Sequence, residues 1–272
     1  MAELENRPTK RLGKRLKKRR KPRSFRQLIP NLVTVFVICA GLTSVRFGME
    51  GKYGYALLLI VLAVIPDAAD GRIARILNSV SRIGAELDSL ADFFNFGIAP
   101  GLLIYNAIFA GTEHANLGWL AVLGLSVCCA LRLARFNVTL AQTDLPAWKS
   151  GYFVGVPAPM LGCLSLLPVL ILLLGYEGIK EFPYTVFVYL VVVGLLAVST
   201  IPTFSIKYLR INPNHILLVL LSCTAVIVSL SVFTWQTLIA ANVLYVASIP
   251  VSAYIYNRRL RLEASASDSK TL

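Results

Sequence analysis

About eight apolar segments follow one another along this chain, and each is long enough to cross a lipid bilayer as a helix. Because lipid offers the backbone no hydrogen bonds, such segments have to form helices that satisfy their own amide groups. The hydrophobic content of 56% excludes an ordinary soluble domain. We therefore predict an all-α, polytopic membrane protein. Its expected spans are 31–49, 54–77, 84–109, 117–137, 157–174, 183–199, 214–233 and 236–256.

The N-terminal segment carries much of the positive charge. Residues 1–26 hold twelve of the 27 Lys and Arg residues against only Glu3 and Glu5, which gives this segment a charge of +10. A basic segment of this kind can bind nucleic acid, but here it leads directly into an apolar helix. We therefore expect it to hold the N-terminus in the cytoplasm against anionic lipid, with no nucleic-acid partner.

The other charges alternate between successive connections. Basic residues gather in the second, fourth and sixth connections and after the last span, namely Arg72, Arg75, Arg82, Arg132, Arg135, Lys149, Lys207, Arg210, Arg258, Arg259 and Arg261. The remaining connections hold several acids, namely Glu50, Glu113, Glu177 and Glu181, together with Lys52, His114 and Lys180. This bias follows the positive-inside rule. It predicts a multi-pass protein of the cell (inner) membrane with both termini on the cytoplasmic side.

Four aspartates, Asp67, Asp70, Asp88 and Asp92, lie inside or beside two of the apolar segments. A carboxylate at full membrane depth costs roughly 2.5–3.5 kcal/mol, so these charges need neutralisation. On helices, Asp67 and Asp70 are three residues apart and Asp88 and Asp92 are four apart, so each pair shares a face. Carboxylate oxygens suit hard divalent cations such as Mg²⁺ or Mn²⁺. Two such ions suit an in-line displacement at phosphorus.

The residues between the acids are consistent with a phosphate ligand. Gly71 and Gly84 let a ligand approach the backbone closely, and Arg75 can bind phosphate oxygens through its guanidinium fork. The whole stretch reads D-x2-D-G-x2-A-R-x8-G-x3-D-x3-D. It resembles the signature of the CDP-alcohol phosphatidyltransferase family at every fixed position.

Other stretches resemble the phosphatidylserine synthase branch of that family. They are I-P-N-L-V-T (29–34), the run from Ser81 to Pro100, L-R-L-A-R-F-N (131–137), Y-F-V-G-V-P-A-P (152–159) and I-P-T-F-S (201–205). The resemblance implies the family's fold over the first six spans. It also implies transfer of the phosphatidyl group from CDP-diacylglycerol to the hydroxyl of L-serine, giving phosphatidylserine and CMP in phospholipid biosynthesis. Two Mg²⁺ or Mn²⁺ ions and a homodimer are implied as well.

The resemblance further implies roles for single residues. One metal ion is bound by Asp67, Asp70 and Asp88, the second by Asp67, Asp88 and Asp92, and Asp92 is also the general base for the serine hydroxyl. The nucleotide is bound by Gly71, Ala74, Arg75, Ser81 and Gly84. Asn31 is either a further nucleotide contact or a helix N-cap residue. No Ser, Cys or His nucleophile arrangement is visible, which favours direct displacement.

A serine pocket has to match an α-carboxylate and an α-ammonium group. Arg132 and Arg135 are candidates for the carboxylate and Glu86 for the ammonium, with Asn95 and Asn137 as neutral partners. Glu86 is the one acid between Asp67 and Asp92 that the signature does not require. Both arginines also satisfy the positive-inside rule, so their charge alone does not assign them to substrate.

The predicted organisation has four parts. These are a basic cytoplasmic tail (1–24), the transferase core (25–210), two additional transmembrane helices (211–257) and a cytoplasmic C-terminal tail (258–272). Two alternatives stay open from the residues alone. One is the same chemistry with glycerol 3-phosphate, inositol phosphate or choline as acceptor. The other is a cation transporter or channel, which leaves Gly71, Arg75 and Gly84 unexplained.

Overall fold

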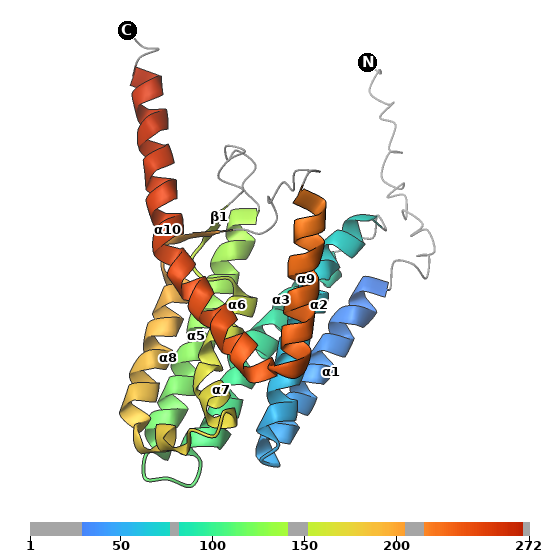
Figure 1. The fold of residues 1–272 in the computed structure, drawn as a ribbon, viewed down its shortest axis with the longest axis vertical. Coiled ribbons are helices and arrows are strands. Elements are labelled where there is room, and N and C mark those ends of the chain that lie inside the picture. The colour runs from blue at the N-terminus through green and yellow to red at the C-terminus, as the bar shows by residue number, and fades with distance from the viewer. Residues whose placement is uncertain (1–28, 77–81, 141–151, 205–214, 269–272) are drawn as a thin grey trace, which may run out of the picture.

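A computed structural model describes residues 29–76, 82–140, 152–204 and 215–268, without the side chains of 29–30, 68–76, 82, 140 and 263–268. The described chain is a bundle of helices (Figure 1). In order these are α1 (Ile29–Met49), α2 (Tyr53–Ile76), α3 (Arg82–Asp92), the π-helical η2 (Phe93–Ile98), α4 (Ala99–Ile104), the π-helical η3 (Tyr105–Phe109), α5 (Ala115–Leu140), β1 (Tyr152–Val154), α6 (Ala158–Ser165), α7 (Leu167–Leu173), the 3₁₀-helical η5 (Glu177–Glu181), α8 (Pro183–Val198), β2 (Pro202–Phe204), α9 (Ile216–Val232) and α10 (Thr234–Asp268).

Within the described residues every predicted span is mostly helical, which confirms the all-α membrane fold. In the described ranges, four helical stretches are long and apolar enough to cross a membrane: Asn31–Met49, Ile83–Phe109, Ala115–Thr139 and Thr234–Leu262. Shorter apolar helices cover Tyr53–Asp67, Pro183–Val198 and Ile216–Val232. The last helix runs on to Asp268, well past its predicted end at residue 256.

The fifth span is interrupted at Leu166, where α6 ends and α7 begins. Pro168 explains the break, because its ring has no N–H and collides with the carbonyl of the residue four positions earlier. That residue is Leu164, and its carbonyl accepts a 2.7 Å hydrogen bond from the hydroxyl of Tyr189 on α8. A carbonyl set free inside the bundle is thus satisfied by a neighbouring helix, as a membrane interior requires.

The third span changes its helical type directly after the acidic pair. The π-helical turn η2 follows Asp92 and precedes Pro100, which cannot donate a hydrogen bond to the carbonyl of Phe96. The wider turn accommodates this loss and places Asn95, Phe96 and Gly97 in the interior. The hydropathy pattern predicts a helix here but not this change of type.

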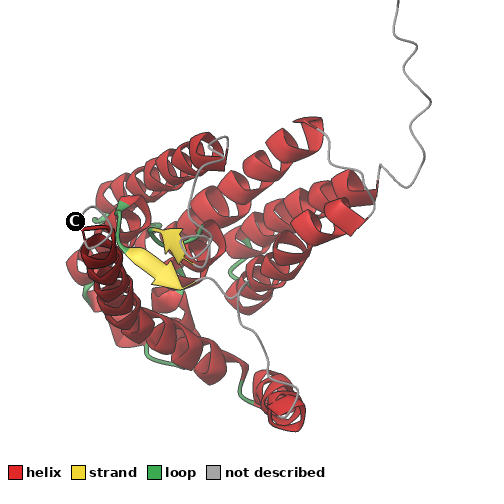
Figure 2. Ribbon diagram, turned by 90° about the horizontal axis from the view of Figure 1, so that it is seen from above, coloured by secondary structure: helices red, strands yellow, loops and turns green. Residues whose placement is uncertain are grey.

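Two short strands, which the sequence analysis did not predict, close one end of the bundle. β1 and β2 pair antiparallel, with Phe153 opposite Thr203. The ring of Tyr152 lies edge-on to that of Tyr256 on α10, with centroids 5.1 Å apart. Seen from above, the strands lie between α10 and the other helices (Figure 2).

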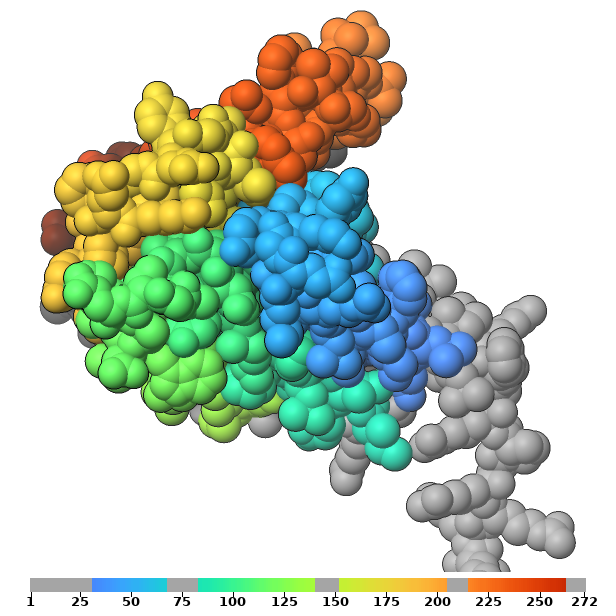
Figure 3. All heavy atoms as spheres, turned by 90° about the horizontal axis from the view of Figure 1, so that it is seen from below, coloured from blue at the N-terminus to red at the C-terminus, as the bar shows by residue number. Residues whose placement is uncertain are grey.

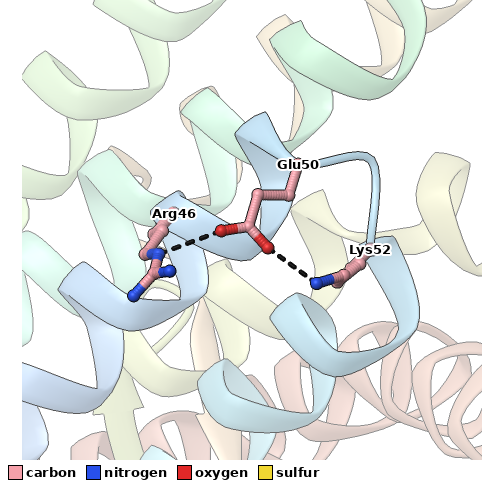
Figure 4. A network of polar contacts seen from close by, with 3 residues as sticks. All are labelled: Arg46, Glu50 and Lys52. Carbon is pink, nitrogen blue, oxygen red and sulfur yellow. Dashed lines mark hydrogen bonds and ion pairs between the residues drawn. The ribbon is translucent and has the colours of Figure 1, made fainter.

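The two ends of the bundle differ in character. The carboxyl end of α2, the amino end of α3 and the strand pair lie at the upper end in Figure 1. The turn after α1 lies at the lower end, where Glu50 bonds to Arg46 Nε at 2.9 Å and to Lys52 Nζ at 2.8 Å (Figure 4). These two hydrogen bonds lower the pKa of the Glu50 carboxyl. The acidic stretch predicted to carry the chemistry is therefore at the opposite end from this network.

The interior holds two apolar clusters. One gathers α2, α4, η3, α7 and α8 around Leu57, Leu103 and Leu170, and the other gathers η2, α5 and α6 around Phe96 and Leu161. By contrast, α9 has no buried residue and stands out at the edge of the space-filling view (Figure 3). Burial therefore concentrates in the first six spans and on the inner face of α10.

Candidate active site

Asp92 interacts with two of the other three signature aspartates, one on α2 and one on its own helix. The carboxyl group of Asp92 is in hydrogen-bonding contact with that of Asp67 and interacts electrostatically with that of Asp88. Asp67 comes from α2, whereas Asp88 and Asp92 come from successive turns of α3. Carboxylates this close repel one another unless a proton or a cation lies between them. The arrangement therefore provides the oxygen donors that a hard cation requires.

A buried arginine on a third helix faces this acidic group. Arg132 of α5 is only 7% exposed, and its guanidinium interacts electrostatically with Asp92 and Asp67. The guanidinium carbon also lies 5.8 Å from the centre of the Phe136 ring. Among the residues that the structure describes, its Nε has no hydrogen-bond partner. A buried guanidinium donor of this kind is costly unless a ligand completes it.

Asn95 lies one turn beyond Asp92 and is fully buried. Its Nδ2 donates a 2.9 Å hydrogen bond to the carbonyl of Ala91, while its Oδ1 has no partner within the described part of the chain. Gly41 of α1 lies directly against it, because a Cβ at position 41 would be 2.1 Å from that oxygen. Besides Arg132 Nε, the Oδ1 atom of Asn95 is therefore a second buried polar atom near the acids without a hydrogen-bond partner in the described part of the chain.

The other serine-pocket candidates have different surroundings. Arg135 donates hydrogen bonds to the carbonyls of Val198, Ser199 and Val154, which gives it a structural task. The exposed Asn137 donates a 3.1 Å hydrogen bond to the hydroxyl of Ser89, so it links α5 to α3. Glu86 is exposed on α3. Of the five candidates, Arg132 and Asn95 are the two that are buried next to the acids.

The nucleotide candidates lie mostly outside what is described. The backbones of Asp70, Gly71, Ala74 and Arg75 belong to the last turns of α2, but their side chains are outside the described set. Ser81 falls between the described ranges. Gly84 and Asn31 are described and half-buried. Because α1 already begins at Ile29, Asn31 lies inside its first turn, which corrects the alternative of an N-cap role.

Comparison with known proteins identifies the family. Residues 27–201 match the model of the CDP-alcohol phosphatidyltransferase family. The chain belongs to this family. The matched segment contains the acidic group, Arg132 and strand β1, and it ends just before β2 and well before α9 and α10.

Several relatives carry the name CDP-diacylglycerol–serine O-phosphatidyltransferase. One from Mycobacterium leprae is 38% identical over 249 residues, covering 88% of this chain and 79% of that protein. One from Mycobacterium tuberculosis is 37% identical over 239 residues, covering 85% and 81%. One from Helicobacter pylori is 36% identical over 213 residues, covering 76% and 86%.

Members of this family generally depend on divalent metal ions. The donor set fits such an ion, since carboxylates from α2 and α3 are in contact and face each other. Within the described residues, which exclude the side chain of Asp70, no group of three His, Cys, Asp or Glu is arranged to hold a metal ion. A cavity of about 360 Å³ lies at the opposite end, lined by residues such as Tyr53, Leu173 and Trp235, and is remote from the acids.

One residue of interest was missed by the sequence analysis. Tyr245 of α10 interacts electrostatically with Arg132, although it lies beyond the residues that carry the family resemblance. A pattern in the sequence could have pointed to this residue. The last apolar span carries polar side chains three or four residues apart around Ile249, which puts them on one face of a helix: Asn242, Tyr245, Ser252 and Tyr256.

Proposed function

We propose that this protein transfers the phosphatidyl group of CDP-diacylglycerol to the hydroxyl of L-serine, giving phosphatidylserine and CMP. Family membership and the names of its relatives support the reaction type and the acceptor. The observation that carries the proposal is the contact between Asp67 and Asp92 beside the buried Arg132, inside the segment that matches the family. This group of charges is what a phosphoryl transfer inside a membrane needs.

The chemistry is a direct displacement. The serine hydroxyl oxygen forms a bond to the phosphatidyl phosphorus, the bond between that phosphorus and the CMP oxygen breaks, and the hydroxyl proton moves to Asp92. Asp92 is suited to this role because it interacts with the acids Asp67 and Asp88 as well as with the cation Arg132. A base so placed keeps its proton close to the charges that develop in the reaction.

The four aspartates are proposed to hold two Mg²⁺ or Mn²⁺ ions. Asp67, Asp70 and Asp88 would bind one, and Asp67, Asp88 and Asp92 the other. When bound, these ions supply charge neutralisation for the diphosphate and for the departing phosphate. This assignment also explains why carboxyl groups that repel one another are retained at the end of two apolar helices.

The remaining assignments complete the proposed site. Gly71, Ala74, Arg75, Ser81, Gly84 and Asn31 would bind the nucleotide. Arg132 and Asn95 are the best placed of the serine candidates, because they are buried next to Asp92. The other three candidates are kept: Arg135, Asn137 and Glu86. Of these, Arg135 already donates hydrogen bonds to three backbone carbonyls.

The site is proposed to face the cytoplasm. In Figure 1 the acidic end of α2 and α3 is also the end toward which the last helix extends, carrying Arg258, Arg259 and Arg261. Under the positive-inside rule this end belongs to the cytoplasmic side of the cell membrane, where CMP can leave. A homodimer, as the family resemblance implies, is proposed for the assembly.

The function is tested with purified protein in lipid nanodiscs. CDP-diacylglycerol is supplied with L-serine, glycerol 3-phosphate, inositol phosphate or choline, and both CMP release and the lipid product are measured. We expect CMP release that depends on serine, with phosphatidylserine as the product. CMP release that does not depend on serine and is stimulated by glycerol 3-phosphate, inositol phosphate or choline would overturn the proposed acceptor.

A further inference from the structure

The last helix has a polar inner face although it lies outside the matched segment. In α10, Asn242, Ile249 and Ser252 are buried, and Tyr245 packs on the cluster that contains Leu133 and Val193. These positions follow one another at intervals of three and four residues, so they share one face of the helix. By contrast, Tyr254 on the same helix is 69% exposed. Asn242, Tyr245 and Ser252 of α10 are therefore directed toward the transferase core.

The hydroxyl of Tyr245 is a buried, unsatisfied polar group within the described part of the chain. Its oxygen is buried and has no hydrogen-bond partner among the described residues. The hydroxyl of Thr203 is nearby, but it donates its own hydrogen to the carbonyl of Gly155 at 2.9 Å, so it has no hydrogen left to donate to Tyr245. A buried hydroxyl without a partner is destabilising, because it has lost its hydrogen bonds to water and gained none in return. Such a group in a membrane helix calls for a ligand or a function.

Tyr245 interacts with a second buried polar group that lacks a hydrogen-bond partner within the described ranges, the guanidinium Nε of Arg132. Tyr245 of α10 packs on the cluster that contains Leu133 of α5 and interacts electrostatically with the neighbouring Arg132. On its other side Arg132 interacts with Asp92. Arg132 therefore interacts both with the proposed general base and with a tyrosine of another helix.

We propose that Tyr245 is a binding and specificity-determining residue that, together with Arg132, holds the α-carboxylate of the acceptor amino acid. This inference rests on the proposed function, which makes serine the acceptor. A carboxylate accepts hydrogen bonds from both the guanidinium N–H of Arg132 and the phenol O–H of Tyr245, so one ligand group gives both donors a partner. It also adds a negative charge next to a buried cation. An acceptor that lacks the carboxylate, such as ethanolamine, would leave both donors unsatisfied and be rejected.

The test uses Tyr245→Phe, which removes the hydroxyl and keeps the ring that packs on α5 and α8. The matched control is Tyr254→Phe on the exposed face of the same helix. We expect the KM for serine to rise about tenfold or more in Tyr245→Phe, because a hydrogen bond to a charged group is lost. The KM for CDP-diacylglycerol should stay unchanged and kcat should stay within about twofold. The control should match the wild type.

Ethanolamine and a binding measurement separate recognition from packing. The preference for serine over ethanolamine should fall about tenfold in Tyr245→Phe, since only serine has the carboxylate. Serine should raise the thermal unfolding temperature of the wild type but not of Tyr245→Phe, which reports binding without turnover. An unchanged KM for serine in folded Tyr245→Phe overturns this inference alone. A wild-type protein that does not use serine overturns the proposed function itself.

Discussion

The guanidinium of Arg135 on α5 donates a hydrogen bond of 2.6 Å to the carbonyl oxygen of Val198, the last residue of α8. The same group donates to the carbonyls of Ser199 at 2.9 Å and Val154 at 3.1 Å. One cation thus holds together two chain segments, the carboxyl end of α8 and strand β1. Gly155 at a φ of +76° completes this junction, because a Cβ there would be 2.5 Å from the carbonyl oxygen of Ala197.

Replacing Arg135 by Lys should therefore destabilise the fold. A single ammonium group cannot reach three carbonyls in the geometry of the guanidinium fork, and we expect a loss of about 2 kcal/mol. The measurement is thermal unfolding in detergent, followed by helical circular dichroism. Arg258→Lys, on the exposed end of α10, is the control and should unfold like the wild type. Equal stability of Arg135→Lys and Arg258→Lys would show that the junction does not need the fork.

Gly118 and Gly124 of α5 offer a second matched pair. A Cβ at position 118 would be 2.4 Å from the Cβ of Phe109, which is buried, whereas a Cβ at position 124 meets nothing within 4 Å. Gly118→Ala should therefore cost about 1–3 kcal/mol through overpacking. Gly124→Ala should be neutral or add up to about 1 kcal/mol through better helix propensity. The unfolding temperatures of the two variants should thus move in different directions, and a stabilised Gly118→Ala would contradict the close approach of α5 and η3.

Asp92→Asn tests the proposed base. The amide cannot accept the serine proton, so we expect CMP release to fall about a thousandfold or more, while binding of CDP-diacylglycerol is largely kept. Turnover is measured by CMP release and binding by the shift of the unfolding temperature with the lipid nucleotide. Glu113→Gln, in the exposed loop at the far end of the bundle, is the charge-matched control. Turnover retained in Asp92→Asn would exclude this residue as the base.

Removal of divalent metal should abolish turnover and lower stability together. Without cations the contact between Asp67 and Asp92 joins like charges, whereas a bound ion joins the two helices. We expect chelated protein to be inactive and to regain activity on addition of Mg²⁺ or Mn²⁺. Addition of either ion should also raise the unfolding temperature of the wild type, but much less that of Asp67→Asn. Full turnover in the presence of chelator would remove the proposed metal role of the aspartates.

The sequence by itself determined the class of fold and placed two of the four aspartates on one face of a helix. Apolar runs of bilayer length can only be helices, because lipid leaves the backbone no other partners, and within the described residues every predicted span is mostly helical. The spacing of Asp88 and Asp92 puts both on one face of a single helix through local geometry alone. These features depend on residues that are close in the sequence, so the pattern contains them.

Only the tertiary structure decided which distant residues meet. The contact of Asp92 with Asp67, the ties of Arg135 to Val198 and the pairing of β1 with β2 join segments that no local periodicity relates. The same is true of Tyr245, whose hydroxyl matters only because α10 turns that face toward Arg132. Hydropathy reports whether a side chain prefers lipid or protein. It does not report the partner, which is set by how the helices pack against one another.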